Sequence, residues 1–261
     1  MSGATDLVLR RDADGVAWLT LNRPDKGNAL SEAMLAALDA RLAEVARMPE
    51  IRVVVLGAAG RLFCTGHDLT EMRAHRGEPD YASALFARCS RLMAGIGRLG
   101  KPVIAMVQGP ATAAGCQLVA SCDLAYAAET ARFAVSGITL GLFCATPSVA
   151  LSRAVPRKQA MEMLLTGEFI PAAKAAAIGL VNATVPAEAL EAQVAEVAAT
   201  IAAKLGRATA LGKEMFYRQM EMDLDAAYAY AGACMAENLG FAETEAKIDA
   251  FLDKTHKKPN A

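Results

Sequence analysis

A run of small residues between two apolar segments is the stretch of this sequence best suited to hold an anion. Residues 103–107 read V-I-A-M-V, a pattern typical of a buried strand, and Gly109 and Pro110 end it. Five small residues, 111–115, precede a helical pattern at 116–121. Because the first amides of a helix have no internal acceptor, they are available to an oxygen anion. Tight packing of a helix against a sheet explains the same small residues equally well.

A second loop of the same kind occurs earlier in the chain. Residues 61–71 read R-L-F-C-T-G-H-D-L-T-E, with a turn at Gly66. Asp68 and Glu71 have the spacing of a capping box for a following helix, and this explains Asp68 without a catalytic role. Like the first loop, this one follows an apolar run, residues 51–56. Two sets of free amides are therefore expected to converge on one carbonyl oxygen.

Composition and charge narrow the class of protein. The chain has 261 residues, 54% of them hydrophobic and 21% charged, enough for the core of one large globular domain. A formal net charge of -1 gives no basis for binding nucleic acid or an acidic membrane surface. No apolar run approaches the ~20 residues that cross a bilayer, so no membrane partner is expected.

The cysteines and the first residues suggest a compartment. The six cysteines form no C-x-x-C pair and have no histidine at zinc spacing, so we expect reduced core thiols and no metal. The start M-S-G-A-T-D has no basic segment followed by an apolar one and is not rich in arginine. This composition argues against a secretory or transit signal. We therefore expect a cytoplasmic protein.

Apolar periodicity predicts a mixed α/β chain that becomes purely helical after Ala187. A β-hairpin is expected around the D-A-D-G turn at 12–15, and Ser31 is expected to cap the first long helix. Residues 70–79 are expected to be a loop beyond a first helical turn. Strands are expected at 8–11, 16–21, 51–56, 103–107, 124–127, 133–135 and 181–185. Helices are expected at 32–47, 81–99, 116–121, 148–153, 157–166, 172–178, 188–204, 207–220, 224–239 and 244–254.

Four separated motifs occur in a specific order: N-R-P-D-K-G-N-A-L, F-C-T-G-H-D-L, V-Q-G…A-A-G-C-Q-L and C-D-L-A-Y-A. In these motifs the chain resembles the crotonase, or enoyl-CoA hydratase/isomerase, superfamily from about Val8 to the last helix. G-H-D-L, G-L-F-C-A-T-P and A-V-P-R-K resemble its enoyl-CoA hydratase domain-containing protein 3 subgroup. The resemblance implies an α/β fold, a crotonase-like spiral of ββα units over residues 1–195 that binds acyl-CoA. A C-terminal helical trimerisation region, residues 196–261, would follow.

The resemblance also implies an assembly and a substrate. A homotrimer, or a hexamer formed as a dimer of trimers, would bind an acyl-CoA, and no cofactor is expected beyond the coenzyme A of that substrate. Methionines such as Met215, Met220 and Met235 give the helical tail soft apolar surface that suits an interface. Helices that simply cover their own core are the alternative.

Matched to the family's motifs, the backbone amides of His67 and Ala114 would polarise the thioester carbonyl. One such donor typically contributes ~10²–10³ to the rate. Lys26 would contact a phosphate of coenzyme A, although a lone loop lysine is commonly just solvated. The residues that the resemblance places around the substrate are Lys26, Ala29, Leu30, Thr65, Gly66, Asp68, Leu69 and Gly115.

Two positions depart from the family's hydratases, which have two glutamates for acid/base catalysis. The first position is Gln117 here, and the second is Gly137, within F-A-V-S-G-I. A glutamine amide can hold a water but cannot take up its proton. Since acid/base groups contribute ~10²–10⁴ each, efficient hydration is not expected. Replacing both residues by glutamate is expected to raise it.

Two other residues are candidates for the acid/base or nucleophilic role that the absent glutamates leave open. Cys144 occupies a loop position where a related branch of the family has an aspartate, and His67 places an imidazole beside its own amide. A buried inert thiol and an exposed loop histidine are the alternatives. The sequence thus favours an acyl-CoA-processing enzyme that acts through an enolate or an attacked thioester: isomerisation, decarboxylation, thioester hydrolysis or weak hydration. A non-catalytic acyl-CoA-binding protein is the other reading.

Overall fold

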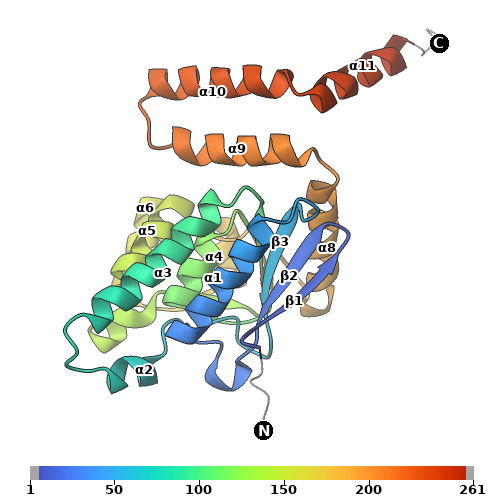
Figure 1. Cartoon of the computed structure of the whole chain (residues 1–261). Helices are drawn as coiled ribbons and strands as arrows, with labels where there is room; N and C mark the ends of the chain where they lie inside the picture. The colour runs from blue at the N-terminus through green and yellow to red at the C-terminus, as the bar shows by residue number, and fades with distance from the viewer. Residues whose placement is uncertain (1–5, 257–261) are drawn as a thin grey trace.

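A six-stranded sheet forms the centre of the computed structural model, which describes residues 6–256 (Figure 1). The strand order is β1-β2-β3-β4-β6-β9, with β1 and β2 antiparallel and the others parallel. The hairpin turns through Asp14 and Gly15, both at positive φ, as the D-A-D-G pattern predicts. The strands are β1 (Val8–Ala13), β2 (Val16–Leu21), β3 (Val53–Ala58), β4 (Val103–Val107), β6 (Leu124–Ala128) and β9 (Ala183–Val185).

Helices cover both faces of this sheet, which explains why its central strands are apolar at almost every position. In β3, Val54 and Leu56 enter the larger core, whereas Val53 and Val55 enter a smaller one on the other face. The smaller core is closed by α8 (Leu190–Ala202). The larger core includes α1 (Glu32–Ala46), α3 (Tyr81–Arg98) and α4 (Ala114–Ser121).

A second, three-stranded sheet lies beside the start of α4. Its strands are β5 (Ala111–Thr112), β7 (Arg132–Ala134) and β8 (Ile170–Pro171). The remaining helices up to residue 189 are α2 (Leu69–Ala74), α5 (Ala145–Ala154), α6 (Arg157–Thr166) and α7 (Ala172–Ala177). Short 3₁₀ helices are η1 (Pro24–Lys26), η2 (Ser136–Leu140) and η3 (Ala187–Ala189).

The helix starts differ most from the expectation at α2, α4 and α5. The segment expected to be largely a loop after residue 70 continues as α2 to Ala74. Helix α4 begins at Ala114, two residues before the expected start, since the small residues there are already helical. Helix α5 begins at Ala145, so that Pro147 lies in the first turn, where its missing N–H has no helical acceptor to lose.

The last helices extend from the core (Figure 1). Helix α9 lies across the end of the core, α10 runs antiparallel on top of it, and α11 leads away. Their bounds are α9 (Gly206–Gln219), α10 (Leu224–Leu239) and α11 (Ala242–His256). The predicted division at residue 195 falls inside α8, whose apolar face covers the sheet as far as Ala198. No helix within residues 6–256 has the length and apolarity needed to cross a membrane.

A buried ion pair attaches α9 to the core. Lys213 Nζ donates to Asp123 Oδ2 at 2.7 Å and to the carbonyls of Ile96 and Lys101 at 2.9 and 3.0 Å. Tyr217 Oη donates to Asp123 Oδ1 at 2.8 Å. Burial lowers the pKa of the Lys213 ammonium, and the Asp123 carboxylate opposes that shift. Because the ammonium has three acceptors, this contact fixes the position of α9.

Large apolar side chains remain uncovered on α9, α10 and the turn between them. Six of them are more than half exposed in the single chain: Phe216, Met220, Leu224, Tyr228, Met235 and Leu239. An exposed apolar patch of this kind commonly marks an interaction surface.

Candidate functional site

The two loops predicted to converge lie against each other. Phe63 N donates to the Pro110 carbonyl at 3.0 Å, and Thr112 N donates to the Cys64 carbonyl at 2.9 Å. Thr112 Oγ1 also donates to the Thr65 carbonyl at 3.0 Å. These bonds align the two segments in parallel, so that the loop after β3 is held beside the loop that leads into α4.

Two glycines permit this close approach. Gly66 has a φ of +90°, and a Cβ there would lie 2.9 Å from Ala113 Cβ and 3.2 Å from Ala114 N. A Cβ on Gly115 would collide with the Cys64 carbonyl oxygen. Any other residue at either position would push the loops apart.

The backbone amides of His67 and Ala114 are available to a ligand. Within the residues that the structure describes, neither N–H donates to a protein acceptor. Both residues line one pocket of about 460 Å³, which we call the amide pocket. Four other predicted residues line it as well: Thr65, Leu69, Gly137 and Cys144. Two unsatisfied donors beside one cavity are the arrangement that binds an oxyanion.

Ala113, immediately before α4, has an unusual backbone conformation. Its φ of 50° and ψ of −120° are rarely adopted by a residue with a side chain. Such a conformation costs about 1–3 kcal/mol and commonly occurs at functional sites. Ala113 N donates to the Ala134 carbonyl at 2.9 Å, which ties this turn to β7. The turn is thereby fixed in the conformation that leaves Ala114 N facing the pocket.

His67 is half-buried with its ring enclosed. Its Nδ1 lies 3.4 Å from the Leu30 carbonyl, and its ring meets Phe86 edge-on with centroids 5.4 Å apart. Nε2 has no hydrogen-bond partner in the described part of the chain and no access to solvent. Burial lowers the pKa of His67, opposed by the Leu30 carbonyl. The imidazole is therefore neutral at pH 7, and its free nitrogen is shielded in this conformation.

Cys144 occupies the space where a side chain at position 137 would begin. Its Sγ accepts a hydrogen bond from Gly137 N at 3.3 Å, and a Cβ on Gly137 would lie 2.8 Å from that sulfur. The same Cβ would collide with the Leu142 carbonyl. A glutamate at 137, part of the double replacement expected to raise hydration, therefore does not fit this backbone. Burial raises the pKa of the Cys144 thiol, which opposes a role as thiolate.

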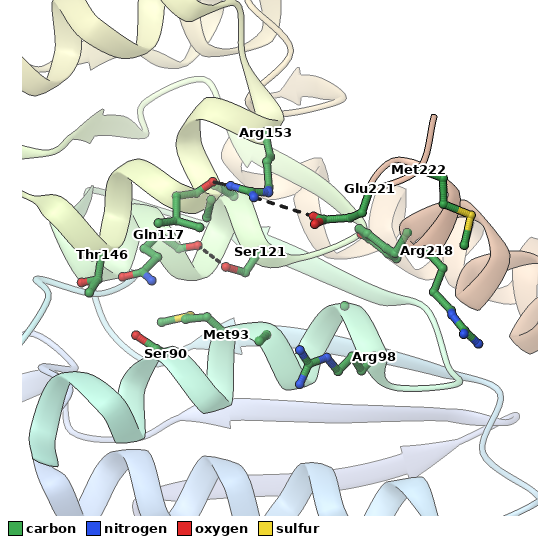
Figure 2. A pocket seen from close by; sticks show the side chains of 16 residues that line it. Ser90, Met93, Arg98, Gln117, Ser121, Thr146, Arg153, Arg218, Glu221 and Met222 are labelled. Atoms are coloured by element: carbon green, nitrogen blue, oxygen red, sulfur yellow. Dashed lines mark hydrogen bonds and ion pairs between the residues drawn. The ribbon is translucent and has the colours of Figure 1, made fainter. Parts of the chain in front are cut away.

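Gln117 lines a different cavity from the other predicted residues. This cavity of about 840 Å³, here called the α9 cavity, lies between α3, α4, α5 and α9. Figure 2 shows the Gln117 side chain pointing into the space between Thr146 and Ser90. Gln117 is 4% exposed, and its Oε1 has no partner within residues 6–256. The predicted catalytic residues thus divide between two adjoining cavities.

The predicted residues on the coenzyme A side do not all reach a cavity. Lys26 is exposed at the end of η1, whereas Ala29 and Leu30 are buried. Leu30 N donates to the Gly66 carbonyl at 2.7 Å, which positions the loop before His67. Leu69 is 55% exposed and lines the amide pocket.

The predicted capping box at Asp68 is only half formed. Asp68 Oδ1 accepts from the amides of Thr70 and Glu71 at 3.0 and 3.2 Å, as expected of a cap. Glu71 does not reach back, however, because its Oε2 accepts from Glu32 N at 2.9 Å and caps α1 instead. Asp68 Oδ2 pairs with Arg23 at 3.1 Å, and these bonds hold the pKa of the carboxyl below its usual value against the effect of burial.

Several residues that shape the site were not predicted. Phe86 and Phe143 line the amide pocket, and Arg98 and Tyr217 line the α9 cavity. Phe86 belongs to a helix whose apolar spacing indicates only that it is buried, so nothing local identifies it as a site residue. The positive φ of Ala113 likewise has no sequence signal, because alanine is typical of ordinary helices.

Known proteins are similar to this chain over almost its whole length. The rat enoyl-CoA hydratase domain-containing protein 3 is 44% identical over 248 residues, which are 95% of this chain and 82% of the relative. A crystal structure of an enoyl-CoA hydratase from Mycobacterium smegmatis is 53% identical with a TM-score of 0.93, covering 97% of this chain and 98% of that one. A crystal structure of the human enoyl-CoA hydratase domain-containing protein 3 is 43% identical with a TM-score of 0.92, covering 98% of this chain and 100% of that one. The resemblance and the α/β crotonase-like fold with C-terminal helices are confirmed.

The predicted cytoplasmic location is contradicted by the same comparison. The rat relative is named as mitochondrial, and so are its mouse, zebrafish and human counterparts. The prediction depends on the first residues, of which 1–5 lie outside the described part of the chain, and on reduced cysteines. Free thiols indicate a reducing compartment and do not by themselves distinguish one such compartment from another.

The match to a family extends through all the motifs described above. A family model described as enoyl-CoA hydratase/isomerase matches residues 11–259, which include both loops, the strained turn at Ala113 and the C-terminal helices. The structures similar to the chain have the same fold over almost its full length. The chain therefore belongs to the enoyl-CoA hydratase/isomerase family.

Proposed function

We propose that the chain is an acyl-CoA-processing enzyme that binds a thioester in the amide pocket and stabilises the charge on its carbonyl oxygen. The donors are the N–H groups of His67 and Ala114, for which the described residues provide no acceptor. This pair of unsatisfied amides is the observation that supports the proposal most directly. A developing enolate oxygen placed between them would gain two fixed hydrogen bonds in a partly dry site.

The lining of the amide pocket limits the reactions that it supports. None of its described lining residues is an aspartate or a glutamate. Gln117 cannot take a proton from water, and the raised pKa keeps Cys144 as a thiol. Efficient 2-enoyl-CoA hydration is therefore not the activity we propose. Decarboxylation of a 2-carboxyacyl-CoA fits better, because breaking the bond to CO₂ leaves its electron pair as the enolate without a protein base. Water then supplies the proton that converts the enolate into the acyl-CoA product.

The coenzyme A part of the substrate is proposed to bind at the outer edge of the two loops. Leu69 is exposed at the amide pocket, and the Lys26 side chain is exposed, as contact with a phosphate requires. The loops next to this edge contain the other predicted residues, Thr65, Asp68 and the buried Ala29 and Leu30. No cofactor besides the coenzyme A of the substrate is proposed.

We also propose that the chain assembles as a homotrimer or as a dimer of trimers. The support is the exposed apolar surface on α9 and α10, which a second copy would cover. Light scattering should then give the mass of three or six chains. A stable, soluble monomer would contradict this assembly.

A panel of acyl-CoAs tests the proposed activity. It should contain 2-enoyl, 3-enoyl, saturated and 2-carboxyacyl thioesters, with products identified by mass spectrometry and binding measured by calorimetry. We expect turnover of the 2-carboxyacyl substrate and slow or no hydration of the 2-enoyl one. Hydration with a kcat of ~10–10³ s⁻¹, which is ordinary for enzymes, would contradict the proposal.

The second candidate is a non-catalytic acyl-CoA-binding protein. The absence of a carboxylate from the lining of the amide pocket favours it, since binding needs only the amides and the loop edge. Measurable affinity for several acyl-CoAs without product from any of them would select this candidate. Product formation that disappears when the amide pocket is distorted would exclude it.

A further inference from the structure

The α9 cavity adjoins the amide pocket along α4. Thr146 lines both cavities. Ala114 faces the amide pocket and Gln117, one helical turn later, faces the α9 cavity, so the two spaces follow the same side of one helix. The nearest large space to an acyl group whose carbonyl lies at Ala114 is therefore this cavity of about 840 Å³, which shares the lining residue Thr146 with the amide pocket.

The character of the α9 cavity changes along its length. Near Gln117 and α4 its walls are apolar or small, including Met93, Ala120 and Ala150. Along α3 the lining extends from Ser90 to Arg98, which is about 12 Å at 1.5 Å per residue. Figure 2 shows Thr146 and Gln117 at one side, and Arg98, Arg218 and Glu221 at the other. The far end is thus cationic and open to water.

The arginines at this end differ in whether they have an ion-pair partner. Arg153 pairs with Glu221 at 3.7 Å, and Arg218 pairs with Glu214 at 2.9 Å. The Arg98 guanidinium forms no hydrogen bond or ion pair with any residue from 6 to 256. One guanidinium therefore remains uncompensated where an extended acyl chain would end.

We propose that the α9 cavity binds the distal end of the acyl group and that Arg98 selects acyl groups ending in a carboxylate. This inference rests on the proposed function, because the thioester must first bind in the amide pocket. A guanidinium binds a carboxylate through two parallel hydrogen bonds, and the apolar walls suit the methylenes between. The α3 stretch of about 12 Å corresponds to roughly eight bonds of ~1.5 Å, which is the length of a suberyl group from its thioester carbon to a distal carboxylate oxygen, so medium-length dicarboxylyl groups match the cavity.

Two thioesters of equal chain length test this selection. Calorimetric Kd values are measured for octanoyl-CoA and suberyl-CoA, which differ only at the distal end. We expect suberyl-CoA to bind about tenfold more tightly, as for a charge-assisted pair at a partly exposed site. Arg98→Gln should abolish the preference by weakening the binding of suberyl-CoA, and Arg98→Lys should retain part of it. Arg88→Gln, on α3 but outside the cavity lining, is the matched control and should keep the full preference.

The outcomes separate this inference from the proposed function. Equal Kd values for the two thioesters, or a preference that survives Arg98→Gln, would overturn the role of Arg98 while acyl-CoA binding stands. Failure of acetyl-CoA, octanoyl-CoA and suberyl-CoA all to bind would overturn the proposed function itself. A preference that weakens at high ionic strength would support the ion pair, because salt screens an exposed charge.

Discussion

The amide pocket and the α9 cavity adjoin each other, yet they are built in different ways. The donors of the amide pocket are backbone amides, and glycine contacts between two loops of the spiral core position them. The α9 cavity is lined by side chains from four helices, and one of these helices reaches the core through the buried Lys213–Asp123 pair. A substitution can therefore disrupt the second cavity while the first stays intact.

This difference explains how the site can lack glutamates at the two matched positions and still present the backbone amides that we propose as oxyanion donors. A backbone N–H survives any change of its own side chain that leaves the loop conformation unaltered. Gln117 and Gly137 differ from the hydratase pattern, whereas Gly66 and Gly115 still permit the contact between the loops. The amide pocket therefore tolerates changes of side chain, because its donors are backbone amides. A new specificity can arise in the α9 cavity, which side chains line.

The largest effect on stability should come from breaking the attachment of α9. Lys213→Met leaves the 15%-exposed Asp123 carboxylate without its cation and two carbonyls without a donor. Loss of one partner of a buried pair costs about 3–5 kcal/mol, which should lower Tm by roughly 10 °C. Calorimetry measures this change. Binding of octanoyl-CoA should weaken more than binding of acetyl-CoA, since only the longer group reaches α9.

Arg11→Gln is the control for that prediction. Arg11 pairs with Glu191 at 3.2 Å, but both side chains are more than half exposed, so the Tm should hardly change. If Lys213→Met melted at the wild-type temperature, the buried pair would not be what attaches α9.

The contact at Gly66 can be broken separately. Gly66→Ala brings a methyl group to 2.9 Å from Ala113 Cβ and should displace His67 N, with a loss of about 10²-fold in turnover of the true substrate. Gly77→Ala is a close control, because Gly77 has a φ of +91° and open space around it. Both variants carry the same free-energy cost of placing a side chain at positive φ, and only Gly66→Ala should lose activity. Equal activity in the two variants would show that the loop contact is not needed.

Sequence alone predicts the parts of this site that depend on neighbouring residues. The strand, turn and helix around Gly109 follow from an apolar run that glycine and proline end. Ser31 caps α1 as predicted, because its side chain accepts from Met34 N at 3.1 Å. Glu71 shows the limit, since its spacing indicates a local capping box while its partner is Glu32 N. The α9 cavity needs a folded chain, because residues far apart in sequence line it. The contact of Cys144 with Gly137 spans only seven residues, but it depends on the backbone path of the loop between them, which no residue pattern indicates.

The missing carboxylate offers a gain-of-function test. Gln117→Glu alone supplies an acid/base group at the first family position, whereas Gly137 has no room for a side chain. Since such a group contributes ~10²–10⁴, hydration of a short 2-enoyl-CoA should rise by about tenfold or more, even with one glutamate. Gln108→Glu, outside the lining of both cavities, is the control. An unchanged rate in Gln117→Glu would mean that Gln117 lies too far from the substrate.

His67 should make stability depend on pH. Burial lowers its pKa below the usual value of 6.5, so protonation favours the unfolded chain. Its contribution to stability is present above pH 6.5 and is lost as the pH falls through that value toward the folded pKa. The Tm of the wild type should therefore fall by a few degrees more between pH 7 and pH 5 than that of His67→Gln. Parallel curves for the two proteins would show that the ring can be protonated without cost.

The smallest effect concerns the strained turn before α4. Ala113→Gly relieves a φ of 50°, worth about 1–3 kcal/mol, but adds about 0.4–1 kcal/mol of unfolded-chain entropy, so the net gain should be about 1 kcal/mol. That corresponds to a rise in Tm of roughly 2 °C by calorimetry. Ala36→Gly, at an exposed site within α1, should move the Tm in the opposite direction by a similar amount. If both variants lost stability, the backbone of Ala113 would be held without the strain that its φ indicates.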